Sequence, residues 1–150
     1  MQDPSAQGLE GVLQALCLEV PDAIGAVLCD FEGETVVMAL GAGDPPPEAL
    51  ARAQEHVPRA LGLEMPLKAF LMRLAGAEPC ALLRLFQGRC EIGHAGALRG
   101  LTMRYAEVDL LVERLPEDFY VVLAVRRPEV TAQALRAVRR AAVLVTPHLL

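Results

Sequence analysis

Two apolar segments joined by a short polar one constrain the fold of this chain more than any other feature of its sequence. The apolar segments are Ala23–Cys29 and Thr35–Leu40, and residues 30–34 (Asp-Phe-Glu-Gly-Glu) join them. Asp30 can hydrogen-bond to its own backbone, and Gly33 can adopt a positive φ angle at little steric cost. The pattern therefore predicts two strands connected by a tight hairpin turn.

Length and composition favour a single domain over residues 1–150, with a flexible segment at residues 1–7. The chain has 150 residues, of which 53% are hydrophobic and 22% charged, enough for one buried core. No apolar run approaches the roughly 18 to 20 residues that cross a bilayer, and the N-terminus lacks the basic start of a secretory signal. We therefore expect a cytoplasmic protein without membrane insertion.

The charge distribution argues against nucleic-acid binding. The net charge is −5, and the basic residues are scattered rather than arranged in a stripe. Arg136, Arg139 and Arg140 form a local exception near the C-terminus. Their helical spacing favours a solvated helix face over a phosphate-binding site.

Amphipathic spacing predicts helices before and after the hairpin. The first runs from about Leu9 to Glu19, and the second starts at Asp44 or Glu48 and is kinked by Pro58. The second helix is expected to bury Leu50, Ala53, Val57 and Leu61.

A third helical piece begins at Pro66 and ends near Gly76. Its expected buried stripe is Leu67, Phe70, Leu71 and Leu74. Periodicity cannot assign residues 79–86 to a helix or a strand, and we favour a short helix followed by a loop. Residues 42–97 as a whole are thus an unusual helical region that prolines interrupt.

The second half of the chain returns to strand patterns. Residues 101–105 alternate between apolar and polar side chains, and Val108, Leu110 and Val112 form one face of a following strand. Residues 119–125 are apolar on both faces and predict a central strand. A last helix from about Thr131 to Pro147 completes an α+β architecture, one five-stranded antiparallel sheet flanked by helices.

The order of these segments and their amino-acid sequences resemble those of the roadblock and dynein light chain family. The matching stretches are residues 20–28 (VPDAIGAVL), the turn at 30–33 (DFEG) and residues 115–123 (LPEDFYVVL) before the final helix. The resemblance covers about residues 9–40 and 98–145. It implies the strand order 2-1-5-4-3, which places the first and fifth strands, the most continuously apolar ones, at the centre. The family usually has one long helix where this chain has the region interrupted by prolines.

Catalytic motifs are not evident in the sequence. Ser5 is the only serine, and Lys68 is the only lysine. No Gly-rich phosphate-binding loop precedes Lys68, so the chain does not resemble a P-loop GTPase, and we expect a solvated lysine. Gly41-Ala42-Gly43 leads into prolines rather than into a helix that would bind phosphate. We therefore expect no enzyme activity and no cofactor.

Metal binding is also not expected. Cys90 and His94, with Cys80 upstream, resemble half of a zinc site, and the same residues form a possible Cys–His nucleophilic pair. Neither arrangement is complete. The acidic hairpin tip, residues 30–34, favours solvation over cation binding. The four cysteines Cys17, Cys29, Cys80 and Cys90 contain no C-x-x-C pair and are expected to be buried, reduced thiols.

The resemblance implies a non-catalytic module that forms a homodimer, or a heteromer with another roadblock-domain protein, and binds or regulates a small Ras-like GTPase, as in bacterial polarity and motility control. The expected partner surface lies on the helical region, at Leu50, Arg52, Glu55, Val57, Arg59, Leu61, Phe70, Arg73 and Leu74. Two alternatives stay open, a small-molecule sensor and a structural adaptor that leaves GTP hydrolysis unchanged.

Overall fold

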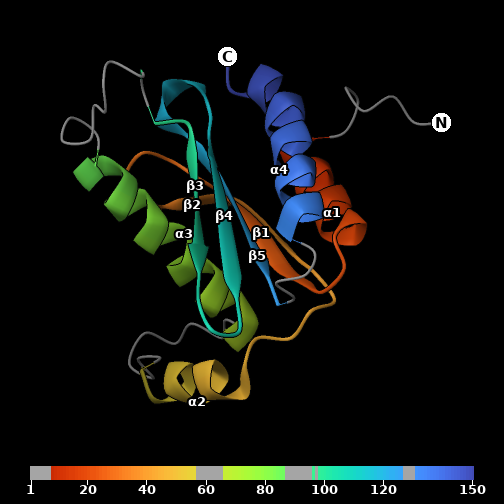
Figure 1. Ribbon diagram of the computed structural model, residues 1–150, viewed down its shortest axis with the longest axis vertical. Helices are drawn as coiled ribbons and strands as arrows, with labels where there is room; N and C mark the ends of the chain where they lie inside the picture. The colour runs from red at the N-terminus through yellow and green to blue at the C-terminus, as the bar shows by residue number, and fades with distance from the viewer. Residues whose placement is uncertain (1–7, 57–65, 87–95, 97, 127–130) are drawn as a thin grey trace.

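The computed structural model describes residues 8–56, 66–86, 96, 98–126 and 131–150 (Figure 1). Its helices and strands follow one another in the order α1 (Leu9–Glu19), β1 (Ala23–Cys29), β2 (Thr35–Leu40), α2 (Pro47–His56), α3 (Leu67–Phe86), β3 (Gly100–Arg104), β4 (Asp109–Arg114), β5 (Tyr120–Val125) and α4 (Thr131–Val145). Short 3-10 turns occupy Pro116–Asp118 and Thr146–His148.

The strands form one antiparallel sheet in the order β2-β1-β5-β4-β3, which confirms the predicted fold. The two central strands β1 and β5 are buried along their whole length, and Val27 lies opposite Val122 between them. Continuous apolar runs become central strands because both of their faces are covered.

Helices cover the two faces of the sheet unequally (Figure 1). On one face α1 packs on β1 and β2 while α4 packs on β4 and β5, and a core that includes Leu13, Leu123 and Val138 lies beneath them. On the other face α3 packs alone on β1, β2 and β5. The core under α3 includes Met72 and Tyr120. The edge strand β3 has the least helical cover, since most of its residues are half-buried or exposed.

The hairpin turn uses the chemistry that its sequence predicts. Asp30 Oδ1 accepts hydrogen bonds from the backbone N–H groups of Glu32 and Glu34, each at 3.0 Å. Gly33 adopts a φ of 84°, and a Cβ at this position would lie 3.2 Å from the Cα of Ala77 on α3. The side chain of Asp30 therefore stabilises the turn, and Gly33 allows the turn to pack closely against α3.

The predicted end of the third helix near Gly76 is wrong, because α3 continues through Gly76 and Pro79 to Phe86. A Cβ on Gly76 would lie 2.6 Å from the Sγ of Cys29, so this glycine allows close contact with β1 instead of ending the helix. The predicted buried stripe is wrong in part, because Leu67, Phe70 and Leu71 are only half-buried and Leu74 is exposed. Met72, Cys80 and Leu83 are almost fully buried instead.

Lys68 is not a freely solvated side chain. Its Nζ is partly buried and donates a hydrogen bond to the backbone carbonyl of Gly41, at 2.6 Å. This bond ties the first turn of α3 to the loop after β2. The residues of three predictions fall outside the described ones, namely the flexible segment predicted at residues 1–7, the kink predicted at Pro58 and the possible Cys90–His94 pair.

Candidate partner-binding surface

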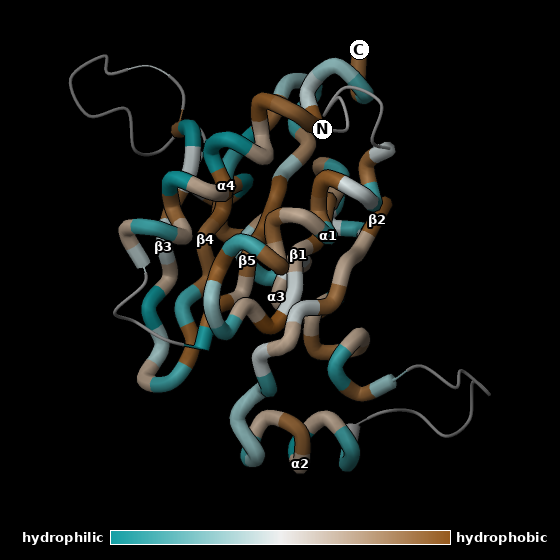
Figure 2. Tube along the Cα trace, turned by 90° about the vertical axis from the view of Figure 1, so that its right-hand side faces the viewer, coloured by the Kyte–Doolittle hydropathy of each residue, from teal (hydrophilic) through white to brown (hydrophobic). Residues whose placement is uncertain are grey.

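A groove on the α3 side of the molecule is the candidate functional site. The helix α2 lies beyond the end of the sheet and packs against α3 (Figures 1 and 2). Together with the turn between β3 and β4, the two helices enclose adjoining hollows of about 220 and 880 Å³. We call this region the helical groove. The residues that line both hollows are Pro46, Ala49, Leu71, Leu74, Glu78, Tyr105 and Val108.

The floor of the helical groove is apolar and open to solvent. Leu74 and Tyr105 are large hydrophobic side chains with exposed fractions of 42% and 50%, and Leu71 and Phe70 are half-buried beside them. Charged side chains, among them Arg52, form part of its lining. Apolar floors with charged rims are typical of protein interfaces.

Acidic groups add a negative potential at the β3–β4 turn. Glu78, Glu48 and Glu107 line the larger hollow. Burial, followed by the nearby Glu78 carboxylate, raises the pKa of the Tyr105 hydroxyl. The phenol is therefore neutral over the physiological pH range and is available to donate a hydrogen bond to a partner.

Arg126 at the end of β5 connects two segments that border the groove. Its Nη2 lies 3.6 Å from Oε1 of Glu107 in the β3–β4 turn, and its Nη1 donates to the backbone carbonyl of Asp44 at 2.9 Å. Asp44 lies in the loop that leads into α2. The guanidinium of Arg126 thus connects the β3–β4 turn to the loop that precedes α2.

A buried carboxylate anchors the strand beyond this turn. Asp109, at the start of β4, is only 3% exposed. Its Oδ2 accepts a hydrogen bond from Oγ1 of Thr131 at 2.6 Å and lies 3.6 Å from Nε of Arg104. The start of α4 is thereby tied to β4, as a buried charge requires.

The structure brings part of the predicted partner surface into the groove. Arg52, Phe70 and Leu74 line it. Leu50 is half-buried, while Glu55 and Arg73 are exposed outside the lining. Val57, Arg59 and Leu61 fall outside the described residues, and the assignment of all nine to a partner surface stays a prediction.

Sequence reasoning missed the contribution of the β3–β4 turn. Tyr105, Glu107 and Val108 reach the groove from a point distant in sequence from α2 and α3. The alternating pattern assigned Tyr105 to a strand, whereas the strand ends at Arg104. An aromatic side chain just past the end of an alternating run was the available signal.

The thiols that the structure describes are buried, as predicted. Cys17, Cys29 and Cys80 are free and inaccessible to solvent. Burial raises the pKa of Cys17 to about 11. A hydrogen bond between the other two thiols raises the pKa of Cys29 and lowers that of Cys80. Among the described residues, no group of three or more histidine, cysteine or acidic residues is placed to hold a metal ion.

None of the helices in the described segments is both long enough and apolar enough to cross a bilayer.

The sheet order and the placement of the helices define a roadblock-like fold, and solved structures confirm it. The Roadblock/LC7 domain from Streptomyces avermitilis has a TM-score of 0.65 at 15% identity, covering 95% of this chain and 98% of that domain. Myxococcus xanthus MglB has a TM-score of 0.64 at 10% identity, covering 94% of both chains. MglB in a tetrameric arrangement has a TM-score of 0.62 at 16% identity, covering 100% of this chain and 95% of that one. No family model and no curated protein sequence matches the chain.

Proposed function

We propose that this chain is a non-catalytic, cytoplasmic regulatory module that pairs with a roadblock-like chain, either a second copy or a relative, and binds a small Ras-like GTPase. The observation that carries the proposal is the helical groove beside the open edge of β3, in a roadblock-like fold. The resemblance of the sequence to roadblock proteins supports the class of partner and a role in bacterial polarity or motility.

Pairing is supported by the unpaired edge of the sheet. Among the described strands, β3 has only β4 as a neighbour, so one row of its backbone N–H and C=O groups has no strand partner in the described part of the chain. Such edges are usually covered or paired in stable assemblies. Tyr105 follows β3 directly, and the exposed Leu74 of α3 lies in the same groove. A second chain that pairs along β3 would cover both side chains.

GTPase binding is supported by the chemistry of the groove rather than by a catalytic group. Its apolar floor is suited to a partner helix or loop, and Arg52, Glu48 and Glu107 offer charges of both signs. A module of this kind would act by positioning the switch segments of the GTPase. A structural adaptor would bind through the same groove without changing the rate of hydrolysis.

The pairing is tested by sedimentation velocity on the purified chain and on the double variant Leu74→Asp, Tyr105→Asp. We expect a dimer, and in the variant a dissociation constant at least about tenfold higher, since two carboxylates would be buried in the interface. Leu18→Asp is the matched control, because Leu18 is 79% exposed on α1, the opposite side of the sheet. Equal weakening by the control would contradict the assignment of the surface. If the wild-type chain remains a monomer alone and with a roadblock-like relative, pairing is disproved.

The GTPase is tested by capture from the native host with the wild-type chain and the double variant as baits. We expect a Ras-like GTPase on the wild-type bait only. GTP hydrolysis is then measured with and without the chain. A changed rate supports a regulator, an unchanged rate in a stable complex supports the adaptor, and equal capture by both baits would disprove binding through the groove.

A further inference from the structure

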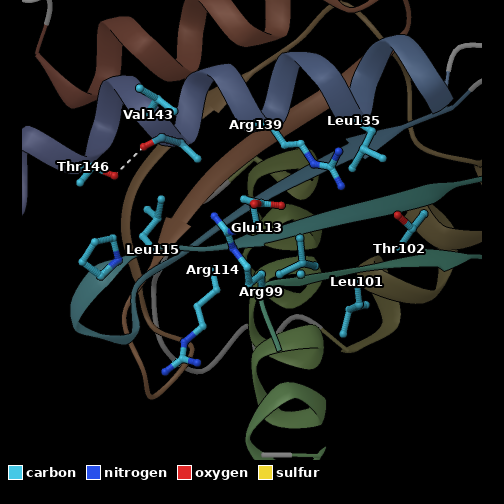
Figure 3. A pocket seen from close by; sticks show the side chains of 14 residues that line it. Arg99, Leu101, Thr102, Glu113, Arg114, Leu115, Leu135, Arg139, Val143 and Thr146 are labelled. Carbon is cyan, nitrogen blue, oxygen red and sulfur yellow. Dashed lines mark hydrogen bonds between the residues drawn. The ribbon is translucent and has the colours of Figure 1, made fainter. Parts of the chain in front are cut away.

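A second concave surface lies on the opposite face of the sheet from the helical groove. It has a volume of about 900 Å³ and lies between β3, β4 and the C-terminal half of α4 (Figure 3). It exists because α4 packs on β4 and β5 and leaves β3 uncovered on this face. We call it the arginine pocket. Its charged lining residues are Arg99, Glu113, Arg114 and Arg139.

Two of these arginines have guanidinium groups available to a ligand. Arg114 donates from Nε to Oδ1 of Asp118 at 3.1 Å, and its charge is thereby matched. Arg99 and Arg139 are exposed, and neither forms an ion pair with a carboxylate of the described residues. They enter the pocket from different elements, Arg99 from the segment before β3 and Arg139 from α4 (Figure 3).

The helical group of arginines near the C-terminus is therefore divided by the fold. Arg140 pairs with Glu19 of α1, and Arg136 is exposed outside the pocket lining. Only Arg139 of this group faces the pocket. The predicted solvated helix face fits Arg136. The sequence did not predict that Arg139 lines a pocket.

Glu113 is close enough to the guanidinium groups of Arg99 and Arg139 to interact with both charges. It is half-buried, and burial raises the pKa of its carboxyl, while Arg139 and then Arg99 act in the opposite direction. Two positive charges thus face one carboxylate that burial makes easier to protonate. The local charge balance favours the entry of one further anion.

Apolar side chains line the rest of the pocket. Leu115, and Leu135 and Val143 of α4, are among them. Val143 is 71% exposed and therefore accessible to a ligand. Pockets of roughly 300 to 1,000 Å³ with apolar walls and a few convergent polar groups are typical of small-molecule sites.

We propose that the arginine pocket binds a small organic anion, a carboxylate or phosphate ester joined to an apolar body. Arg99 and Arg139 bind the anionic group through charge-assisted hydrogen bonds. Leu135 and Val143 contact the apolar body. The site is independent of the helical groove, so its failure and the failure of the proposed function are separate results.

Glu113 gives this site a characteristic pH dependence. A bound anion beside Glu113 disfavours its charged form, so binding takes up a proton, and the affinity for a probe that stays ionised rises as the pH falls. The charged groups that face Glu113 are Arg99 and Arg139. Glu113→Gln removes the repulsion between this carboxylate and the bound anion. The variant should therefore bind the anion more tightly at neutral pH, and its affinity should depend little on the protonation of residue 113.

Isothermal titration calorimetry with octanoate, octyl phosphate and octanol tests the proposal on the full chain. We expect one site for octanoate or octyl phosphate and none for octanol. The variants Arg99→Ala and Arg139→Ala should each weaken binding about tenfold, whereas Arg136→Ala should change it less than twofold. Arg136 is the matched control, being exposed on the same helix outside the pocket.

The two anionic probes distinguish a carboxylate ligand from a phosphate ligand. Tighter binding of octanoate would indicate a carboxylate as the natural anion, and tighter binding of octyl phosphate would indicate a phosphate ester. All three arginines are exposed, so the variants should keep the melting temperature of the wild-type chain. If one of them does not, Val143→Asp provides the alternative test and should abolish binding of both anions. Equal binding of octanol, or equal loss in Arg136→Ala, would overturn the proposal, as would the absence of binding by both anions.

Discussion

On one face of the sheet α1 and α4 lie side by side, whereas α3 lies alone on the other. The paired helices span β2 to β4 and leave β3 open, which produces the arginine pocket of about 900 Å³. On the other face, α2 and the β3–β4 turn border the helical groove beside α3, and its larger hollow has a similar volume of about 880 Å³. The arrangement of the helices on each face thus determines which elements border the concave surface rather than how large the surface is.

The two faces are also held by different forces. The lone helix α3 depends on close contact, since Gly76 sits against the thiol of Cys29 and the side chain of Val27. The opposite face relies on a wider apolar core and on a buried polar bond between Thr131 and Asp109. Substitutions that break one contact at a time measure this difference.

The largest effect is expected for Gly76→Val on the face with one helix. Its side chain would overlap atoms of Cys29 and Val27, because even a Cβ would lie 2.6 and 2.9 Å from them. We expect a loss of about 3 kcal/mol in the free energy of unfolding, measured by denaturant titration. Ala81→Val is the control, because Ala81 is exposed on the same helix. A loss below about 1 kcal/mol would show that α3 shifts easily.

A smaller effect is expected for Thr131→Val on the face with two helices. This change removes the 2.6 Å hydrogen bond to the buried carboxylate of Asp109 while keeping the shape of the side chain. We expect a loss of about 1.5 to 2 kcal/mol, since bonds to charged groups are worth about 1.5 to 3 kcal/mol. Asp118→Ala, which breaks a partly exposed pair with Arg114, should cost no more than about 1 kcal/mol. Equal losses would indicate that burial of Asp109 adds nothing.

The smallest effect on stability is expected for Arg126→Ala, which separates the β3–β4 turn from the loop before α2. Exposed pairs contribute up to about 1 kcal/mol, so the melting temperature should change little. The affinity for a partner in the helical groove should nevertheless fall by about three- to fivefold, because both walls must be ordered on binding. The change is measured by titration of the captured partner. The arginine pocket should be unaffected, and weakened anion binding there would show that the two surfaces communicate.

Most of the sheet was predictable from the sequence because each strand carries its own local signal. Alternation marks β3, and apolar residues on both faces mark β5 as central. The register of β1 on β5 carries no such signal, because both faces of both strands are buried and a shift by one residue would only exchange one apolar face for the other.

The helix α3 was predicted in part, because tertiary packing outweighs local preference at two positions. Gly76 and Pro79 are the usual signals for the end of a helix. Here the glycine allows contact with β1, and both residues lie within the buried side of a longer helix. The cost of proline inside a helix is offset by the core that α3 closes.

The two concave surfaces were the least predictable part. Leu74 and Tyr105 meet in the helical groove from segments that are distant in sequence, and no periodicity encodes their meeting. Arg99, Glu113 and Arg139 are likewise distant in sequence and share the arginine pocket. Sequence patterns report which side chains face one element, whereas sites like these depend on how three elements meet.

The hydrogen bond between Lys68 and Gly41 can be followed by chemical labelling of a single side chain. Lys68 is the only lysine of the sequence, so an amine-reactive reagent has one side-chain target besides the terminal amine. Its Nζ is engaged by a carbonyl at 2.6 Å, and its reaction with an acylating reagent therefore requires this contact to open. The rate of acetylation at Lys68, followed by mass spectrometry, reports how often the start of α3 separates from the loop after β2.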